Sequence, residues 1–481
     1  MFTLNLHIFF FIFTIILLLF EASGPQVVLN ALVLAVIEIY LWAKRENRAG
    51  RVNWFHPVPV FVLGYCIVYY QLPFCYLAGF DLSYHSTRVI FAPENISYCV
   101  LLATLGLASF FCGEQIIYLK TVNNALVSYQ KKYDNNPFKE KYSFRVKIVN
   151  NIVLLLALAF YILNILSIGM NTYFGFNYGV KQGAGGFSNY FEFIYTILMY
   201  LAILLEISKL VNESPKSFKT YFSLWNKKVL IFTFITIVPY LISGDRGSYL
   251  QPLALIFAPY FILVKPLSFF RAGFFVVGLA FILVLVGDTR SAGTVAWRDA
   301  FLSRIEAVNN PARWPTMELA NSFGTFNIAT YYFPERYQYN NGINTIYRIS
   351  AIIPYSSVFT EIEKKNKQND YKFTSGLFFT NILTRGTFSS GSGTSSLADV
   401  FMDFGPSGIP VVLFLWGLLM SYVAKRANMK NSAIYMFLFS YYSYFGIYVN
   451  RSSFFFGWNQ FLWVILMFII IRRLYFRRIQ I

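Results

Sequence analysis

The sequence predicts an all-α integral membrane protein with about twelve transmembrane helices and one large extracytoplasmic loop that contains amphipathic helices. Of the 481 residues, 57% are hydrophobic and only 13% are charged, whereas soluble globular proteins carry roughly 25% charged residues. The apolar residues gather in stretches of about 20 residues, the length that a helix needs to cross the hydrocarbon core. The basic residues concentrate between alternate stretches. These observations exclude a soluble enzyme, a disordered chain and a secreted disulfide-rich protein.

Twelve apolar segments are the predicted spans. They lie at 3–22, 25–43, 57–77, 96–119, 148–169, 189–208, 229–243, 249–264, 272–287, 404–424, 432–449 and 453–471. The first segment is predicted to remain as a span, because no Lys or Arg precedes Lys44 and no small-residue cleavage site follows the segment.

The basic residues predict the orientation of these spans. With the N-terminus inside, the five inner loops and the C-terminal tail hold 25 Lys and Arg, and the short outer loops hold four, which are Arg88, Lys181, Arg246 and Arg451. An excess of this kind follows the positive-inside rule. We therefore expect a multi-pass protein of the bacterial inner, or cytoplasmic, membrane with both termini in the cytoplasm. The net charge of +18 reflects this topology and does not indicate binding of nucleic acid.

Residues 288–403 are predicted to form the large outer loop, which is nearly neutral. The loop holds 11 basic and 10 acidic residues. It follows a nine-span N-terminal membrane region, 1–287, and precedes a three-span C-terminal membrane region, 404–481. Since loops longer than about 15 residues are usually functional or disordered, and this one keeps its aromatic residues, we expect it to be folded as part of one cooperative membrane domain.

Helical periodicity recurs inside the large loop. Apolar residues are spaced three or four apart over 297–308, and further apolar stretches follow at 317–333 and 343–358. This pattern predicts amphipathic helices that lie on the outer surface of the membrane. The Gly- and Ser-rich stretch 388–396 predicts a flexible turn.

Arginines on the outer side are the first candidate site residues. Arg246 and its neighbour Asp245 stand in a short Gly-flanked turn between two spans, and Arg290 directly follows another span. The large loop adds Arg298, Arg304, Arg313, Arg336, Arg348 and Arg385. The planar guanidinium group binds phosphate through two parallel hydrogen bonds, so these residues suggest an anionic ligand. The alternative is that each Arg pairs with a local acid or a lipid headgroup.

Two acids at the outer mouth of the tenth span are the second candidate. Asp399 and Asp403 are four residues apart, so in a helix they share one face. They can serve as a general base and an orienting group, or bind a divalent cation. The alternative is that Asp403 caps the helix that follows and that Asp399 pairs with an Arg.

Four further acids lie near the ends of predicted spans. They are Glu38, Glu114, Glu192 and Glu206. Acids inside a membrane are costly and often functional, but near a span end the side chain can reach the interface, which favours a structural role. Glu192 is on the outer side and could line a cavity.

Three features together resemble a known family. About a dozen spans enclose one large outer loop before the last few spans. The turn 243–247, Ser-Gly-Asp-Arg-Gly, resembles an Arg-Gly turn that follows a middle span. The stretch 399–408 resembles a pattern in which an acid precedes an Asn-Phe-Gly-like corner that opens a span, with Asp399 where Glu is common and Asp403 where Asn is common. The chain resembles the Wzy-type oligosaccharide repeat-unit polymerases of O-antigen and capsule pathways.

This resemblance implies a GT-C-like fold and a glycosyltransferase activity. The enzyme would transfer a growing glycan from one undecaprenyl diphosphate to the non-reducing end of another lipid-linked repeat unit, on the outer face of the membrane. A diphosphate leaving group needs cationic stabilisation, which assigns Arg246, Arg290 and Arg385 to the diphosphate, and an attacking hydroxyl needs a carboxylate, which assigns Asp399 to the acceptor. We expect no cofactor and no metal ion. A protein that regulates chain length is a possible partner.

Two other functions share parts of this architecture. O-antigen ligases, by resemblance, depend on a His in the large outer loop, and 288–403 contain no His. Lipid-linked oligosaccharide flippases, which are transporters, tend to have two similar halves and short loops, and this chain shows no repeat between 1–240 and 241–481. A structural or signalling protein without a ligand is a third possibility, and the Arg-rich outer loop weighs against it.

Overall fold

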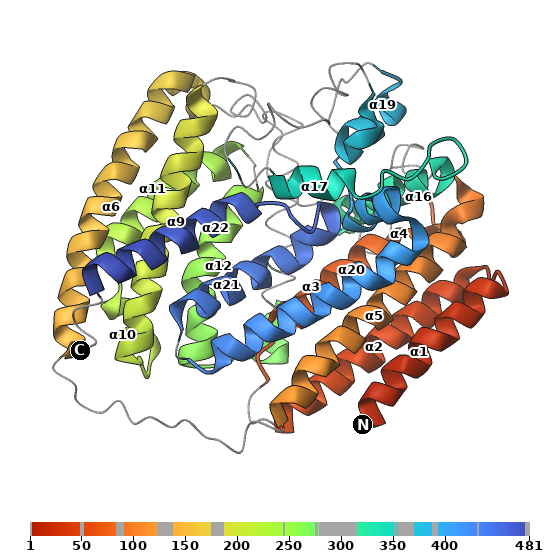
Figure 1. Ribbon diagram of the computed structural model, residues 1–481, viewed down its shortest axis with the longest axis horizontal. Helices are drawn as coiled ribbons and strands as arrows, with labels where there is room; N and C mark the ends of the chain where they lie inside the picture. Colours follow the sequence, from red (N-terminus) through yellow and green to blue (C-terminus); the bar gives the residue numbers. More distant parts are fainter. Residues whose placement is uncertain are drawn as a thin grey trace.

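The structure is a bundle of long helices (Figure 1). The computed structural model describes residues 2–48, 52–82, 91–122, 138–174, 187–243, 246–274, 278, 314, 316–350, 353, 370–386, 393–430 and 432–476. All regular elements in these residues are helical, and no strand occurs among them. The prediction of an all-α chain is therefore confirmed for the part of the chain that the structure describes.

The N-terminal half supplies most of the long helices. In chain order they are α1 (Phe2–Leu19), α2 (Pro25–Arg48), α3 (Pro57–Cys66), η1 (Ile67–Gln71), α4 (Leu72–Leu77), η2 (Pro93–Asn95), α5 (Ile96–Val122), α6 (Phe138–Ile168), α7 (Met170–Tyr173), α9 (Phe187–Glu213), α10 (Phe218–Leu224), α11 (Lys227–Ser243) and α12 (Arg246–Leu263).

The C-terminal half begins with short helices and ends with three long ones. They are α15 (Met317–Ala320), α16 (Phe323–Tyr332), α17 (Ile343–Ser350), η6 (Tyr371–Phe373), α19 (Ser375–Thr384), α20 (Ser396–Asn428), α21 (Ala433–Tyr448), η7 (Val449–Arg451), α22 (Trp458–Ile471) and η8 (Arg472–Phe476).

The predicted spans coincide with helices wherever the chain is described. Each of them overlaps one of the long helices, except 272–287, most of which lies outside the described residues. Seven described helices are long and apolar enough to cross a membrane, and α10 with α11, bent by 89°, adds an eighth candidate. The chain is therefore a membrane protein with several candidate spans, while twelve crossings remain a prediction.

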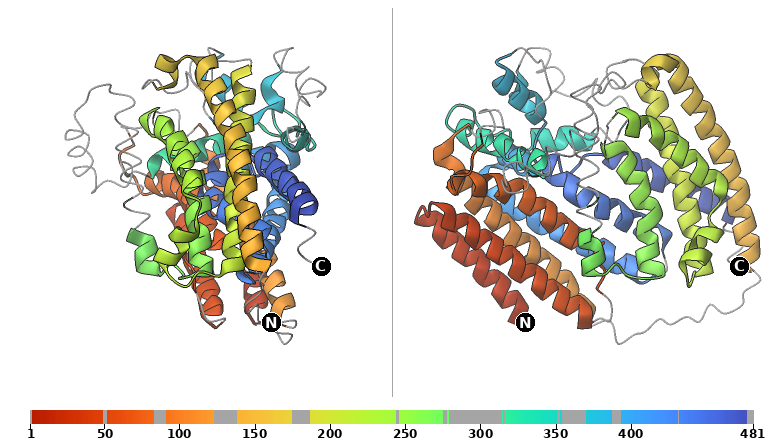
Figure 2. Two further views of the ribbon diagram at one scale, coloured as in Figure 1. Left: turned by 90° about the vertical axis from the view of Figure 1, so that its left-hand side faces the viewer. Right: turned by 180° about the vertical axis from the view of Figure 1, so that it is seen from behind.

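Two groups of helices lie on either side of α21, and α22 lies against the group that contains α9. In Figure 1, α1, α2, α5 and α20 form one group, and α6, α9 and α11 form the other; the view from behind in Figure 2 shows the same division. Contacts of α21 with α3 and α12, and of α22 with α9, join the groups. The short helices α16, α17 and α19 gather at the upper end of the bundle, opposite the end at which α1 begins.

Close contact between α5 and α20 depends on two glycines. A Cβ atom on Gly113 would lie 2.1 Å from the carbonyl oxygen of Phe414, and one on Gly417 would lie 2.1 Å from that of Phe110. Small residues allow helix backbones in membranes to approach in this way, because van der Waals packing is what holds them together. These glycines fix α20, which carries both candidate acids, against the rest of the bundle.

A break divides α20 near its N-terminal end. Gly405 has φ 66° and ψ −162°, a conformation that is essentially restricted to glycine, and Pro406 follows it. A Cβ on Gly405 would also lie 2.8 Å from the ring of Tyr339. The segment before the break, which carries Asp399 and Asp403, is therefore turned relative to the long segment after it.

The acids near the span ends have partners in the structure. Glu38 lies 2.7 Å from Nδ1 of His7. Glu114 is bound by the guanidinium group of Arg45, and Glu206 lies 2.6 Å from Nζ of Lys209. A further bond to Glu206 comes from Nδ2 of Asn150 at 2.6 Å. The side chains of these three acids, Glu38, Glu114 and Glu206, are buried and paired, which favours a structural role. They do not extend to the membrane interface, as a snorkelling side chain would.

The helices of the large loop differ from one another in burial. α17 exposes Ile346 and Ile349, at 65% and 42%, as expected of an amphipathic helix on the membrane surface. In contrast, α16 is buried along almost its whole length, and Asn327 within it bonds the backbone of Ala92 next to η2. The prediction of a surface helix within 317–333 is therefore wrong, because α16 packs between other elements. The predicted helix at 297–308 lies outside the described residues.

Candidate active site

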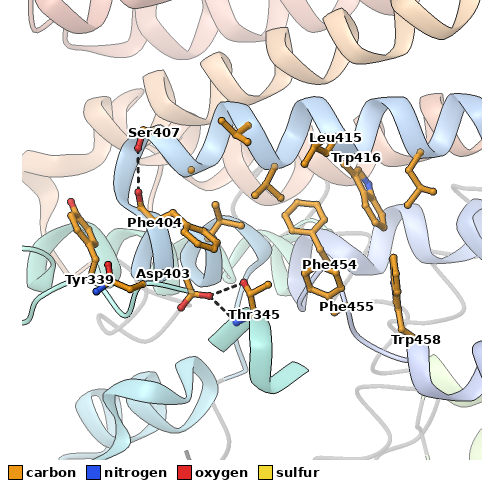
Figure 3. A pocket seen from close by; sticks show the side chains of 16 residues that line it. Tyr339, Thr345, Asp403, Phe404, Ser407, Leu415, Trp416, Phe454, Phe455 and Trp458 are labelled. Atoms are coloured by element: carbon orange, nitrogen blue, oxygen red, sulfur yellow. Dashed lines mark hydrogen bonds between the residues drawn. The ribbon is translucent and has the colours of Figure 1, made fainter. Parts of the chain in front are cut away.

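A cavity of about 720 Å³ lies along α20 at its break (Figure 3). It has a polar end, formed by Tyr339, Asn341, Thr345, Asp403 and Ser407. The remainder of its described lining is apolar and consists of Val400, Phe404, Gly408, Val411, Val412, Leu415, Trp416, Leu419, Phe454, Phe455 and Trp458.

Asp403 joins α20 to α17 at the polar end. Its carboxylate accepts hydrogen bonds from the backbone N–H groups of Asn344 and Thr345, at 3.1 and 2.8 Å, and from the Thr345 hydroxyl at 2.7 Å. An acid that binds the first N–H groups of a helix satisfies donors that have no partner within the helix and interacts favourably with the helix dipole. Asp403 therefore caps α17, which precedes it in the chain, rather than the helix that follows it.

Asp399 lies one turn before Asp403 and is 7% exposed. Its Oδ1 accepts a bond from the Thr394 hydroxyl at 3.0 Å, while Oδ2 has no hydrogen-bond partner among the described residues. The positive charge of Arg348 acts on this carboxylate. Arg348 follows Thr345 by three residues, so α17 binds Asp403 through its N-terminus and carries a positive charge near Asp399 in its next turn.

The start of α20 is held rigidly. Ser395 caps the helix by accepting a bond from the N–H of Ala398 at 3.4 Å, and the Tyr69 hydroxyl accepts one from the N–H of Leu397 at 3.1 Å. Thr394, Ser395 and Ser396 are all buried. The last part of the predicted flexible turn 388–396 is therefore ordered, because its hydroxyls are used in capping and in buried hydrogen bonds; 387–392 lie outside the described residues.

Tyr339 forms the wall of the polar end beside the break. Its ring fills the space that a side chain on Gly405 would occupy. Desolvation raises the pKa of the Tyr339 phenol above its usual value. The phenol therefore stays protonated near neutral pH and can donate a hydrogen bond into the cavity.

Aromatic side chains build the other end of the cavity. Figure 3 shows Trp416, Phe454, Phe455 and Trp458 together, on the far side from Asp403. The rings of Trp416 and Phe454 are 5.1 Å apart, and those of Phe455 and Trp458 are 5.2 Å apart. The neighbouring Leu415 on α20 is 56% exposed. The cavity thus combines a polar head with an open apolar groove, the shape required by an amphiphilic ligand.

Only part of the predicted arginine cluster is described. Arg348 faces Asp399, whereas Arg336 is exposed and lies over the rings of Tyr331 and Tyr332, at 5.2 and 5.1 Å from their centroids. Arg385 is exposed at the end of α19. Of the described residues, neither Arg336 nor Arg385 lines the cavity.

For the remaining predicted site residues, the structure describes either the backbone alone or nothing. Arg246 is the first residue of α12, and its side chain is not described. The others outside the described residues are Asp245, Arg290, Arg298 and Arg313. In the part of the chain that the structure describes, no group of three or more His, Cys, Asp and Glu side chains is placed to hold a metal ion.

Sequence reasoning missed several residues of the cavity. Thr345 and Tyr339 have no motif around them, and only the folded chain brings them to Asp403. The run Phe454–Trp458, with its four aromatic residues, was assigned to a membrane span. The density of large aromatic rings in this run, directly after a short turn, is the one signal in the sequence that indicates the wall of a ligand-binding site.

The comparisons with known proteins extend over almost the entire chain. A sequence profile described as O-antigen polysaccharide polymerase Wzy matches residues 2–479. No curated protein and no solved structure gives a significant match.

Proposed function

Because this chain belongs to the O-antigen polysaccharide polymerase Wzy family, we propose that it joins lipid-linked repeat units into a long glycan. The growing glycan is transferred from undecaprenyl diphosphate to the non-reducing end of another lipid-linked unit, on the outer face of the cytoplasmic membrane. The observation that carries this proposal is the cavity on α20, which places Asp403 at the head of an apolar groove, with Asp399 one helical turn before it.

The shape of the cavity suits one lipid-linked glycan. The groove follows α20 from Gly408 to Leu419, which at 1.5 Å per residue is roughly 17 Å. An isoprenoid chain is apolar and fits such a groove, while the diphosphate and sugars occupy the polar end. Two buried indole N–H groups, on Trp416 and Trp458, have no partner among the described residues and can donate to the ligand.

The side chains at the polar end supply the reaction. The acceptor hydroxyl attacks the anomeric carbon of the donor sugar, a new C–O bond forms, and the C–O bond to the diphosphate breaks. The hydroxyl proton passes to the Asp399 carboxylate, whose Oδ2 has no partner among the described residues. Arg348 stabilises the charge of the departing diphosphate, together with Arg246 and Arg290. Asp403 positions α17 and thereby Arg348.

The proposal also covers the orientation of the chain in the membrane and the residues around the site. The chain is a multi-pass membrane protein, and we place both termini in the cytoplasm and the 288–403 loop outside. Arg385 and Arg336, which are exposed on the same segment, together with Arg298 and Arg313, bind more distant phosphate or acidic sugar groups. Asp245 orients Arg246. A chain-length regulator is the expected protein partner.

Replacement of Asp399 tests the reaction directly. Cells that lack the gene are complemented with the wild type, Asp399→Asn or Asp399→Glu, and the surface glycan is separated on a silver-stained gel. We expect a full ladder from the wild type, single repeats from Asp399→Asn and a partial ladder from Asp399→Glu, since only a carboxylate accepts the proton. Asp370→Asn is the matched control, because Asp370 is on the same loop and its partner among the described residues is Lys372, at 3.8 Å.

The same experiment separates the alternatives. Deletion of the gene leaves single capped repeats if the protein is a polymerase, unattached polymer on the lipid carrier if it is a ligase, and no surface units if it is a flippase. A full ladder from Asp399→Asn at normal protein level would remove Asp399 from the reaction and support a structural ion pair with Arg348.

A further inference from the structure

A second group of polar side chains lies between α6, α9 and α11, and none of them lines the cavity on α20. We call it the tyrosine cluster, and it consists of Tyr161, Asn164, Tyr173, Glu192, Tyr195 and Tyr240. The Tyr240 hydroxyl donates to Glu192 and bonds the Tyr195 hydroxyl at 2.8 Å. The ring of Tyr161 contacts those of Tyr173 and Tyr195, with centroids 5.8 and 5.3 Å apart.

The register of α6 and α9 places Asn164 at the level of Glu192. These helices are antiparallel, with Asn150 bonded to Glu206 and Tyr161 against Tyr195. Asn164 lies three residues beyond Tyr161, and Glu192 lies three residues before Tyr195. An amide and an acid thus lie at the same level of this helix pair twice, and at one of the two levels they are bonded.

The two levels differ in how their polar groups are satisfied. At the inner level, Asn150 donates to Glu206, which is neutralised by Lys209 at 2.6 Å. At the outer level, Asn164 is only 1% exposed, and neither atom of its amide has a hydrogen-bond partner among the described residues. A buried polar group without a partner costs about 1–3 kcal/mol. A side chain that serves only packing would not be an asparagine at this position.

The tyrosine cluster is shallow enough to be reached from the outer side. Asn164 is four residues from the end of α6, Glu192 is five residues from the start of α9, and Tyr240 is three residues from the end of α11. At 1.5 Å per residue, all three lie within about 8 Å of the helix ends. Glu192 and Tyr240 are also partly exposed.

The chemistry of the tyrosine cluster matches a saccharide. Phenol hydroxyls donate and accept, the Glu192 carboxylate accepts, and the Asn164 amide does both. A sugar ring presents hydroxyls of both kinds around its edge and an apolar face, which an aromatic ring covers. A lipid tail would leave the Asn164 amide without a hydrogen-bond partner.

We propose that the tyrosine cluster is a saccharide subsite that holds sugar residues of the second lipid-linked glycan, outside the cavity on α20. The proposal rests on the proposed function, because a polymerase joins two glycans and must bind both at once. The cavity on α20 accommodates one amphiphile, and the tyrosine cluster holds the sugars of the other. Arg246, six residues after Tyr240 at the start of α12, lies at the same outer end as the subsite.

Asn164→Leu is the variant that tests the subsite, since Leu is similar in size and removes both polar atoms. The full-length protein in nanodiscs is titrated calorimetrically with the single-repeat oligosaccharide released from the surface glycan of cells that lack this gene. We expect binding to the wild type and at least tenfold weaker binding to Asn164→Leu. The melting temperature of the variant should be unchanged or higher, because a buried unpaired amide has been removed. A structural amide would give a lower melting temperature instead.

Two further variants complete the design. Tyr240→Phe keeps the ring, removes the hydroxyl that joins Glu192 to Tyr195, and should weaken binding in the same assay. Asn151→Leu is the matched control, because it makes the same change on α6 at the inner level, about 20 Å from Asn164 along the helix, and should bind as the wild type does.

The outcomes separate this inference from the proposed function. A purified wild type that does not elongate lipid-linked repeat units refutes the proposed function, whatever the titration gives. A wild type that elongates them but does not bind the oligosaccharide, or an Asn164→Leu variant that binds it like the wild type, refutes the subsite alone. Undecaprenyl diphosphate should bind Asn164→Leu and the wild type equally, since its site is the cavity on α20.

Discussion

Replacement of Asp403 by Ala should release α17 from α20. The carboxylate accepts three hydrogen bonds from Asn344 and Thr345, and loss of an N-cap costs about 0.5–2 kcal/mol. Because these bonds end on a charged group and are partly buried, we take the upper value, about 2 kcal/mol, as the free energy that α17 loses with its cap. That corresponds to a factor of roughly 30 in the docking equilibrium of α17. A helix of eight residues is not stable alone, so α17 should unfold when it detaches.

Hydrogen exchange of the backbone amides measures this effect where it occurs. In Asp403→Ala, the amides of 343–350 should lose protection by roughly 30-fold, while those of α5 keep theirs, because local opening involves only the detached helix. Polymerisation should fall in parallel, since Arg348 is no longer held at Asp399. Asp403→Asn should lose much less protection, because Asn caps helices nearly as well as Asp. Thr345→Val, which removes only the hydroxyl bond, should fall between the wild type and Asp403→Ala.

The two measurements together decide the role of Asp403. Loss of polymerisation with unchanged protection of 343–350 would show that Asp403 acts on the substrate and not through α17. Unchanged protection with normal activity would refute the capping argument altogether.

Three further outcomes are expected. Gly405→Ala should lower the free energy of unfolding by about 1–3 kcal/mol, because Ala is strained at φ 66° and its Cβ meets the Tyr339 ring. Thermal melting of the purified protein tests this, and an unchanged melting temperature would contradict it. Leu415→Trp should fill the apolar groove and reduce turnover of a lipid-linked substrate roughly tenfold without lowering the melting temperature, whereas normal turnover would place the lipid elsewhere. Arg246→Ala should leave single capped repeats on a glycan gel, and Arg246→Lys should restore the ladder only in part if two parallel hydrogen bonds to phosphate are needed; full restoration would mean that charge alone is sufficient.

The break in α20 separates the candidate acids from the long apolar part of the same helix. Asp399 and Asp403 lie on the short segment before Gly405, and the groove lies along the segment after it. A straight helix would carry the acids in line with the membrane span. The Phe404-Gly405-Pro406 corner instead lets one helix supply both the polar head and the apolar groove of a single cavity.

The sequence alone determined that the chain is an all-α membrane protein and which stretch of it carries the two candidate acids. Apolar stretches of membrane-spanning length depend only on composition along the chain, so the predicted spans overlap the described helices, although α6 and α20 begin ten and eight residues before the spans predicted on them. The pair Asp399 and Asp403 was found for a similar reason, because two acids four residues apart share a helix face whatever surrounds them.

Only the tertiary structure decided which residues meet at that site. Arg348 was one of several equivalent arginines in the sequence, and the docking of α17 on Asp403 brought its charge close enough to act on Asp399. The aromatic wall at 454–458 joined the cavity because the turn between η7 and α22 packs against Trp416 of α20, and α16 became buried because other elements cover it. Contacts between segments far apart in the chain depend on packing, and packing leaves no local pattern in the sequence.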